Sequence, residues 1–146
     1  MPKFMKLLNN ISRSQMAFRR GKLEADFASG YHTYILAICK RPGVTQDALA
    51  KDICVNKSTV ARRLDSLEEE GYVYRKPDST DKRCLLVYPT EKMLLLLPQV
   101  KAVAKEWMDI LTRGVSEEEM ALFESVLVRM EESARRAAFE MGGEAD

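Results

Sequence analysis

Residues 43–92 read GVTQDALAKDICVNKSTVARRLDSLEEEGYVYRKPDSTDKRCLLVYPTEK, and this stretch decides the fold of the 146-residue chain. Thr45 stands at an N-cap position before a segment with one apolar side, which predicts a short helix over 46–53. After a tight break, Asn56 caps a second predicted helix over 57–70. A short helix, a break and a second helix describe a helix-turn-helix.

The hydrophobic pattern changes its period after the second of these helices. Residues 72–75 and 84–88 are rich in aromatic and β-branched side chains, and a polar, turn-forming stretch separates them over 77–81. This pattern predicts a β-hairpin with a loop longer than two residues. A hairpin that directly follows a helix-turn-helix makes it winged, so we expect a mainly α fold with a small β-hairpin wing.

The second helix of the helix-turn-helix has the polarity of a helix that reads DNA. At about 100° per residue its aliphatic side chains share one side and must face the core. Ser58 and Arg62 stand on the opposite side, and Thr59 and Arg63 flank them. The exposed face is therefore basic and hydroxylic at its start and acidic at its end. A helix dipole favours the reverse order, whereas a recognition helix enters the major groove with its N-terminal residues.

Further helices are predicted before and after this core. Residues 3–21 follow helical spacing, and another helix opens at Ser29-Gly30 and stops at Pro42. Beyond the hairpin we expect a helix over 91–112, in which Pro98 should cause a kink or mark a late start.

The last predicted helix covers 117–139 and opens on a capping box formed by Ser116 and Glu119. Its apolar stripe and that of the first helix find no partner in a core of this size, so we expect them to pack on each other across a two-fold axis. The residues expected to meet, partly from two subunits, are Phe4, Leu7, Leu8 and Ile11 with Phe123, Leu127, Met130 and Ala134.

Charge is distributed unevenly although the formal net charge is only +1. Residues 1–22 carry six basic groups and no acidic group, while residues 116–146 carry nine acidic groups and three arginines. The segment 56–64 carries three basic groups and no acidic group. A nearly neutral chain with this segregation can still present one electropositive face to DNA.

Several classes of function lack the residues they need. The chain has one histidine and three cysteines, Cys39, Cys54 and Cys84, with no CxxC pair. We therefore expect no metal site, no cofactor and no catalytic residues, and reduced thiols in a cytoplasmic protein. Apolar runs are too short for a membrane span, and the first residues lack the apolar core of a signal peptide.

The stretch 43–92 also resembles the core of the MarR (multiple antibiotic resistance) regulators. The matching elements are T-Q-x-x-L-A, x-N-K-S-T-V-x-R-x-L-D-x-L-E-x-x-G-x-V, the wing D-x-R and T-E-K. The resemblance implies a single MarR-like domain over 1–146, with a winged core over about 30–90. It further implies a homodimer formed by helices at about 3–21 and 91–139, and a ligand-responsive repressor that binds a pseudo-palindromic operator.

The resemblance places DNA contacts on the recognition helix and on the wing. In the family the wing aspartate orients an arginine, which enters the minor groove beside the recognition helix. A narrow A·T-rich minor groove concentrates negative potential and therefore suits an arginine. The residues so implied are Asn56, Lys57, Ser58, Thr59, Arg62, Arg63, Asp81, Lys82 and Arg83.

An effector site is also implied, because members of the family often bind small aromatic or anionic ligands between the dimerisation helices and the DNA-binding lobe. Arg13, Met16, Arg20 and His32 are the candidates. Two other readings stay open: the basic first helix could pair with the acidic last helix of a partner, and His32 could be a hydrogen-bonded structural residue.

Two alternatives to a ligand-responsive regulator remain at this point. One is a thiol-based redox regulator of the same fold, in which Cys84 beside Arg83 is the most exposed candidate for a thiol of low pKa. The other is a winged helix that serves only as a protein-interaction module. A metal-sensing relative is not favoured, since the cysteines and the lone histidine form no ligand cluster.

Overall fold

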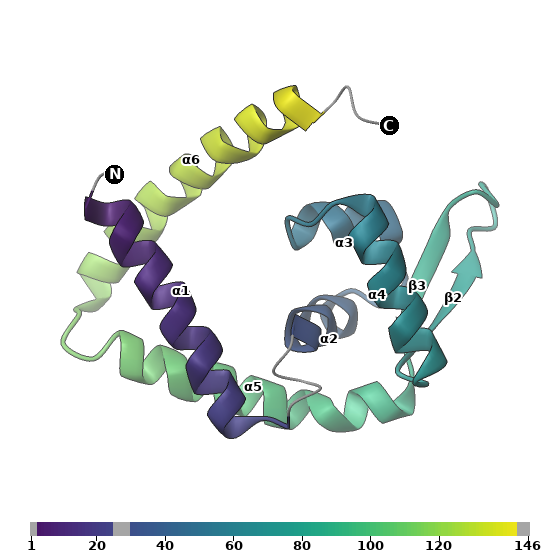
Figure 1. Cartoon of the computed structure of the whole chain (residues 1–146), viewed down its shortest axis with the longest axis horizontal. Coiled ribbons are helices and arrows are strands. Elements are labelled where there is room, and N and C mark those ends of the chain that lie inside the picture. Colours follow the sequence, from purple (N-terminus) through teal and green to yellow (C-terminus); the bar gives the residue numbers. More distant parts are fainter. Residues whose placement is uncertain (1–2, 25–29, 143–146) are drawn as a thin grey trace. The chain divides into compact units, whose positions relative to one another are not determined.

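The computed structural model describes residues 3–24 and 30–142 (Figure 1). Its elements follow the order α1 (Lys3–Lys22), α2 (His32–Lys40), β1 (Val44–Thr45), α3 (Gln46–Asp52), α4 (Lys57–Glu69), β2 (Val73–Pro77), β3 (Leu85–Pro89), α5 (Glu91–Leu111) and α6 (Glu117–Gly142). The chain divides into two compact units, one up to Trp107 and the other from Met108 onward. This order confirms the predicted mainly α fold with a hairpin after the helix-turn-helix.

The hairpin belongs to a three-stranded antiparallel sheet of order β1-β3-β2. Val87 on β3 pairs with Val44 on β1 and with Arg75 on β2, so β3 is the central strand. The sequence did not predict β1, because two residues are too few to show the alternation that marks a strand.

A hydrophobic core lies under the helix-turn-helix. Val60, Leu64 and Leu67 on α4 are at most 1% exposed, which confirms the side of the helix assigned to the core. The other fully buried side chains come from α2, α3, the sheet and α5; they are Ile35, Ile38, Leu49, Val73, Val87 and Met93. Burial of each such side chain stabilises the fold by roughly 1.5–3 kcal/mol, so this core fixes which face of α4 is left outside.

The predicted caps are found at the N-termini of α3 and α4. Thr45 Oγ1 accepts a 3.0 Å hydrogen bond from the Ala48 N–H, and Asn56 Oδ1 accepts one of 2.8 Å from the Thr59 N–H. Between these helices Cys54 has a φ of 55°, a left-handed conformation that costs a non-glycine residue roughly 1 kcal/mol. The chain therefore turns sharply enough to place the two helices against each other.

The outer helices follow the predictions with small differences. α5 begins at Glu91 and continues through Pro98, so the proline does not delay its start. The capping box before α6 is confirmed, because the Ser116 N–H donates to Glu119 (2.9 Å) and the Glu119 N–H donates to Ser116 Oγ (3.1 Å). α6 runs three residues past the predicted end at 139. The predicted helix start at Ser29 lies outside the described residues, and α2 itself begins at His32.

α1 is held by the part of α5 that shares its unit. The rings of Phe18 and Trp107 have centroids 5.4 Å apart, and Lys22 Nζ lies 2.9 Å from Glu106 Oε1. Towards its N-terminus α1 exposes Phe4, Leu7 and Ile11. None of the described helices is both long enough and apolar enough to cross a membrane.

Candidate nucleic-acid interface

The N-terminal turn of α4 is organised by Asn56. Its side-chain oxygen accepts hydrogen bonds from the Thr59 N–H at 2.8 Å and from the Ser58 hydroxyl at 2.9 Å. Asn56 therefore serves as a cap that also orients Ser58. Ser58 and Arg62 both lie exposed on the side of α4 that faces away from the core.

Lys57 points from the first turn of α4 towards α3. Its ammonium nitrogen lies 3.7 Å from Asp47 Oδ2, and both side chains are almost two-thirds exposed. An exposed pair of this kind contributes only about 0–1 kcal/mol. The lysine can thus leave Asp47 for a phosphate at little cost.

Arg63 has a different environment from Arg62. Its guanidinium carbon lies 5.5 Å from the centre of the Tyr31 ring, just before α2. Tyr31 is buried, and its hydroxyl donates a 3.1 Å hydrogen bond to Glu70 at the end of α4. Burial and the neighbouring Glu70 raise the pKa of Tyr31 above its usual value of 10. Both arginines are exposed, and they differ in that Arg63 lies over the Tyr31 ring.

The wing turn is closed by Asp81. Its carboxylate accepts a 3.0 Å hydrogen bond from the backbone N–H of Arg83, and its carbonyl accepts another of 3.0 Å from the Cys84 N–H. Asp81 thus orients the backbone from which the Arg83 side chain leaves. Lys82 and Arg83 are both exposed.

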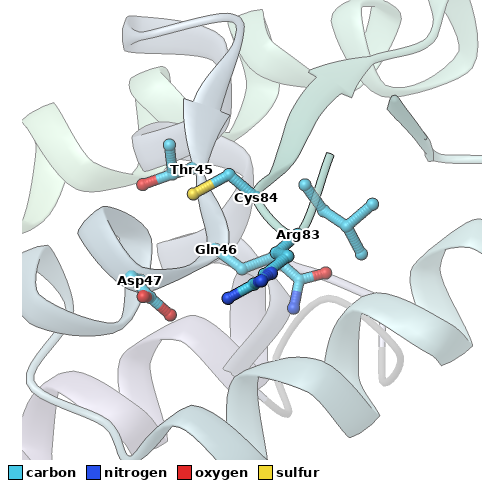
Figure 2. Close-up of a pocket in the computed structure, with 6 residues that line it drawn as sticks. Thr45, Gln46, Asp47, Arg83 and Cys84 are labelled. Atoms are coloured by element: carbon cyan, nitrogen blue, oxygen red, sulfur yellow. The ribbon is translucent and has the colours of Figure 1, made fainter. Parts of the chain in front are cut away.

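A small pocket lies where the wing meets the start of α3. Figure 2 shows Gln46 and Arg83 reaching into it, one from α3 and the other from the wing. The complete lining is Thr45, Gln46, Asp47, Arg83, Cys84 and Leu85.

Sequence reasoning missed Arg75, which binds three partners beside this pocket. Its guanidinium donates to Asp65 and Glu68 on α4 and to Gln46 on α3. The available signal was strand alternation, because Arg75 stands two residues after the buried Val73 and so shares its face of the sheet. A half-buried arginine needs acidic partners, and α4 supplies two that are three residues apart.

The four effector candidates differ in their exposure to solvent. Arg13, Met16 and Arg20 are exposed on α1, whereas His32 is half-buried at the start of α2. The charged neighbour of His32 is Arg19, which was not a candidate. Burial first, and then the charge of Arg19, lowers the pKa of His32 from 6.5 to about 4.

Arg19 and His32 each have one buried nitrogen atom that forms no hydrogen bond within the described residues. His32 Nδ1 and Arg19 Nε have no hydrogen-bond partner within residues 3–24 and 30–142. His32 Nε2 lies 3.0 Å from the Thr33 hydroxyl. His32 is therefore half-satisfied, which fits neither a fully bonded structural histidine nor a completed ligand contact.

The three cysteines are free thiols in different settings. Cys39 is half-buried, and burial raises the pKa of its thiol. Cys54 is exposed in the helix-turn-helix break, whereas Cys84 is half-buried beside Arg83, so the expectation that Cys84 is the most exposed candidate thiol is wrong. Across the described part of the chain, no three His, Cys, Asp or Glu side chains are grouped so that they could hold a metal ion.

Comparison with known proteins gives one consistent result. The model of the MarR family matches residues 33–85. The HTH-type transcriptional regulator YybA of Bacillus subtilis (strain 168) is 27% identical over 113 residues, which are 77% of this chain and 75% of that protein.

Solved structures agree along almost the whole length. A crystal structure of MarR is 32% identical with a TM-score of 0.74, and the match covers 96% of this chain and 95% of that one. A MarR family transcriptional regulator from Listeria monocytogenes, crystallised with a 26mer DNA, has a TM-score of 0.88 at 22% identity. That match covers 100% of this chain and 99% of the other, and it shows the shared fold.

Proposed function

This chain belongs to the MarR family of transcriptional regulators, and we propose that it acts as a homodimeric repressor on a pseudo-palindromic operator. One observation carries the proposal. The aliphatic side of α4 is fully buried, so the polar side chains near its N-terminus, Ser58 and Arg62 among them, are presented outward. A recognition helix reads the major groove with that end.

We assign the contacts by chemistry. Ser58, Thr59 and Arg62 read base edges, because hydroxyl and guanidinium groups can bond to them in the major groove. Lys57 binds phosphate. Arg63, which lies over the Tyr31 ring, is at the edge of the surface that contacts DNA. Lys82 and Arg83 on the wing meet the neighbouring phosphates and the minor groove, respectively, while Asn56 and Asp81 orient the residues beside them.

We propose that the whole chain works as one MarR-like domain, with the winged core over about 30–90 and helices on both sides for dimerisation. In support, α1 exposes Phe4, Leu7 and Ile11 in the single chain, and α6 exposes Phe123 and Met130. Obligate interfaces are more apolar than ordinary surface and commonly bury 2,000 Å² or more. A second copy of the chain would cover these side chains.

Removal of residues 1–12 tests the dimer. We expect a chain that sediments as a monomer or aggregates, and that loses operator binding. A fully folded, stable dimer after this deletion would show that the interface lies elsewhere.

We further propose that a small aromatic or anionic effector releases the operator. His32 and its neighbour Arg19 support this proposal, since both carry buried nitrogen atoms that lack a partner in the described chain. Arg13, Met16 and Arg20 stay candidates for the same contact. A shift in thermal unfolding temperature with aromatic carboxylates, reduced in His32→Gln, tests it.

The experiment that tests the function is selection of bound fragments from the source genome by the full-length protein. We expect the fragments to share two half-sites whose centres lie about 10 bp, or a multiple of that distance, apart. The affinity for a duplex of scrambled sequence should be lower by roughly 10³ or more at physiological salt. Equal affinity for selected and scrambled duplexes would refute sequence-specific regulation.

A further inference from the structure

We propose that Arg75 is a positioning residue that couples the recognition helix to the wing, so that both reach the DNA in a fixed relative geometry. This inference rests on the proposed function. It concerns a residue that lies behind the DNA-facing surface and that needs no contact with DNA.

Arg75 donates three hydrogen bonds to residues of two helices, and we call Arg75 with these partners, Asp65, Glu68 and Gln46, the Arg75 joint. Nη2 donates to Asp65 Oδ1 at 2.6 Å, Nε donates to Glu68 Oε2 at 2.7 Å, and Nη1 donates to Gln46 Oε1 at 3.0 Å. The guanidinium is planar, and its donors point in fixed directions. One side chain on β2 therefore fixes the position of α4 and of the first residue of α3 at the same time.

Arg75 is itself well anchored. Its side chain is only 17% exposed, and its backbone pairs in register with the fully buried Val87. Burial alone would lower the pKa of Arg75, but the hydrogen bonds and charges of Glu68 and Asp65 raise it. The Arg75 guanidinium therefore keeps its positive charge.

The joint acts where a helix could otherwise rotate. The Tyr72 N–H donates a 2.8 Å hydrogen bond to the Leu67 carbonyl, so the backbone already ties the C-terminal end of α4 to the start of β2. The Arg75 bond to Asp65 lies closer to the DNA-reading end. Asp65 follows Arg62 by three residues and is its neighbour on the helix surface. Fixing Asp65 thus fixes the direction of Arg62.

The same joint reaches the wing through Gln46. This side chain accepts from Arg75 and also lines the pocket that Arg83 enters (Figure 2). A series of hydrogen bonds therefore runs from Asp65 through Arg75 to Gln46, and Gln46 lines the same pocket as the wing arginine. In addition, Arg75 offsets one of the two negative charges that Asp65 and Glu68 would otherwise present to phosphates near the groove.

The test compares Arg75→Gln with Lys76→Gln in the full-length protein. Lys76 is the next residue of β2, is exposed and carries the same charge, so it controls for the loss of one cation. Affinities are measured for a genome-selected operator and for a scrambled duplex. We expect Arg75→Gln to lower the ratio of the two affinities about tenfold, as for one broken network of charged groups, and Lys76→Gln to leave the ratio within about twofold.

Three further variants distinguish positioning from charge and from folding. Arg75→Lys keeps the charge but not the planar fork, and should lose most of the same ratio. Asp65→Asn combined with Glu68→Gln breaks the joint from its exposed ends, and should lower the ratio without weakening binding to the scrambled duplex. Arg75→Gln added to Arg83→Ala should cost less than it does alone, because the wing contact that it positions is already absent.

The outcomes separate this inference from the function itself. An unchanged affinity ratio in Arg75→Gln, full recovery in Arg75→Lys, or purely additive losses with Arg83→Ala would overturn the inference alone. A wild-type protein that does not distinguish operator from scrambled duplex would overturn the proposed function, and the inference with it. If Arg75→Gln unfolds, the Asp65→Asn, Glu68→Gln variant decides by the same ratio.

Discussion

The guanidinium of Arg63 lies 5.5 Å from the centre of the Tyr31 ring, so one arginine of the recognition helix is already engaged within the protein. A cation over an aromatic face is worth roughly 0.5–1 kcal/mol at an exposed site. Arg63 would give up this contact to reach a base.

From this contact we expect Arg63→Ala to lower operator affinity by less than about 1 kcal/mol, and to lower the free energy of unfolding by a similar amount. Fluorescence anisotropy and urea unfolding of the same preparation measure the two quantities. Tyr31→Phe is the matched control, because it keeps the ring under Arg63 and removes the hydroxyl with its interactions with Glu70 and Arg63. A loss above about 2 kcal/mol in operator affinity for Arg63→Ala would place Arg63 among the base contacts instead.

The ion pair between Lys57 and Asp47 leads to a prediction about affinity for DNA of any sequence. Lys57→Ala should weaken binding to operator and scrambled duplexes alike, and should reduce the slope of log affinity against log salt by about one unit. Asp47→Asn should strengthen both affinities slightly, because it releases the lysine from its 3.7 Å ion pair. A Lys57→Ala variant that discriminates less between sequences would indicate a base contact rather than a phosphate contact.

The wing predicts a dependence on flanking sequence. Arg83→Ala should cost roughly 1–3 kcal/mol on operators with A·T-rich flanks and clearly less on G·C-rich flanks, because only a narrow minor groove concentrates negative potential. Asp81→Ala should show the same pattern, since Asp81 holds the Arg83 backbone at 3.0 Å. Equal losses on both kinds of flank would reduce Arg83 to a phosphate contact.

His32 predicts how stability depends on pH. Its pKa is lowered from 6.5 to about 4 in the folded protein, so the unfolded chain takes up the proton first as the pH falls. The contribution of His32 is therefore complete above about pH 7 and decreases as the pH falls from 6.5 towards 4. Between pH 7.5 and pH 5 the loss from this residue should be roughly 2 kcal/mol.

Urea unfolding of wild type and His32→Gln at these two pH values isolates the histidine from the carboxylates, which both proteins share. The wild type should lose more stability than the variant by about the stated amount. Identical pH dependence in the two proteins would mean that His32 is accessible to water and titrates normally.

The helix-turn-helix was predictable because its signals are local. Thr45 and Asn56 are polar caps next to the helices that they begin, and the apolar spacing of α4 fixed its buried side. Each signal depends on a few neighbouring residues, and each was confirmed.

The parts that were missed depend on residues distant in sequence. The bonds of Arg75 to Asp65 and Gln46 join positions 10 and 29 residues apart, and these positions meet through the packing of α4 and the registers of β1 and β2 against β3. In the same way, the choice of Arg19 rather than Arg20 beside His32 is set by the rotation of α1 about its axis, which a sparse apolar stripe defines poorly. The DNA and effector contacts themselves stay predictions.

The central claim is that the exposed N-terminal face of α4 reads base edges, and Arg62→Ala tests it most directly. The measurement is the affinity of this variant for the genome-selected operator and for a scrambled duplex at moderate salt. We expect the operator affinity to fall by about 1–3 kcal/mol, the value of one good base contact, while the scrambled duplex changes far less. An unchanged operator affinity, with the variant folded as the wild type, would contradict the account.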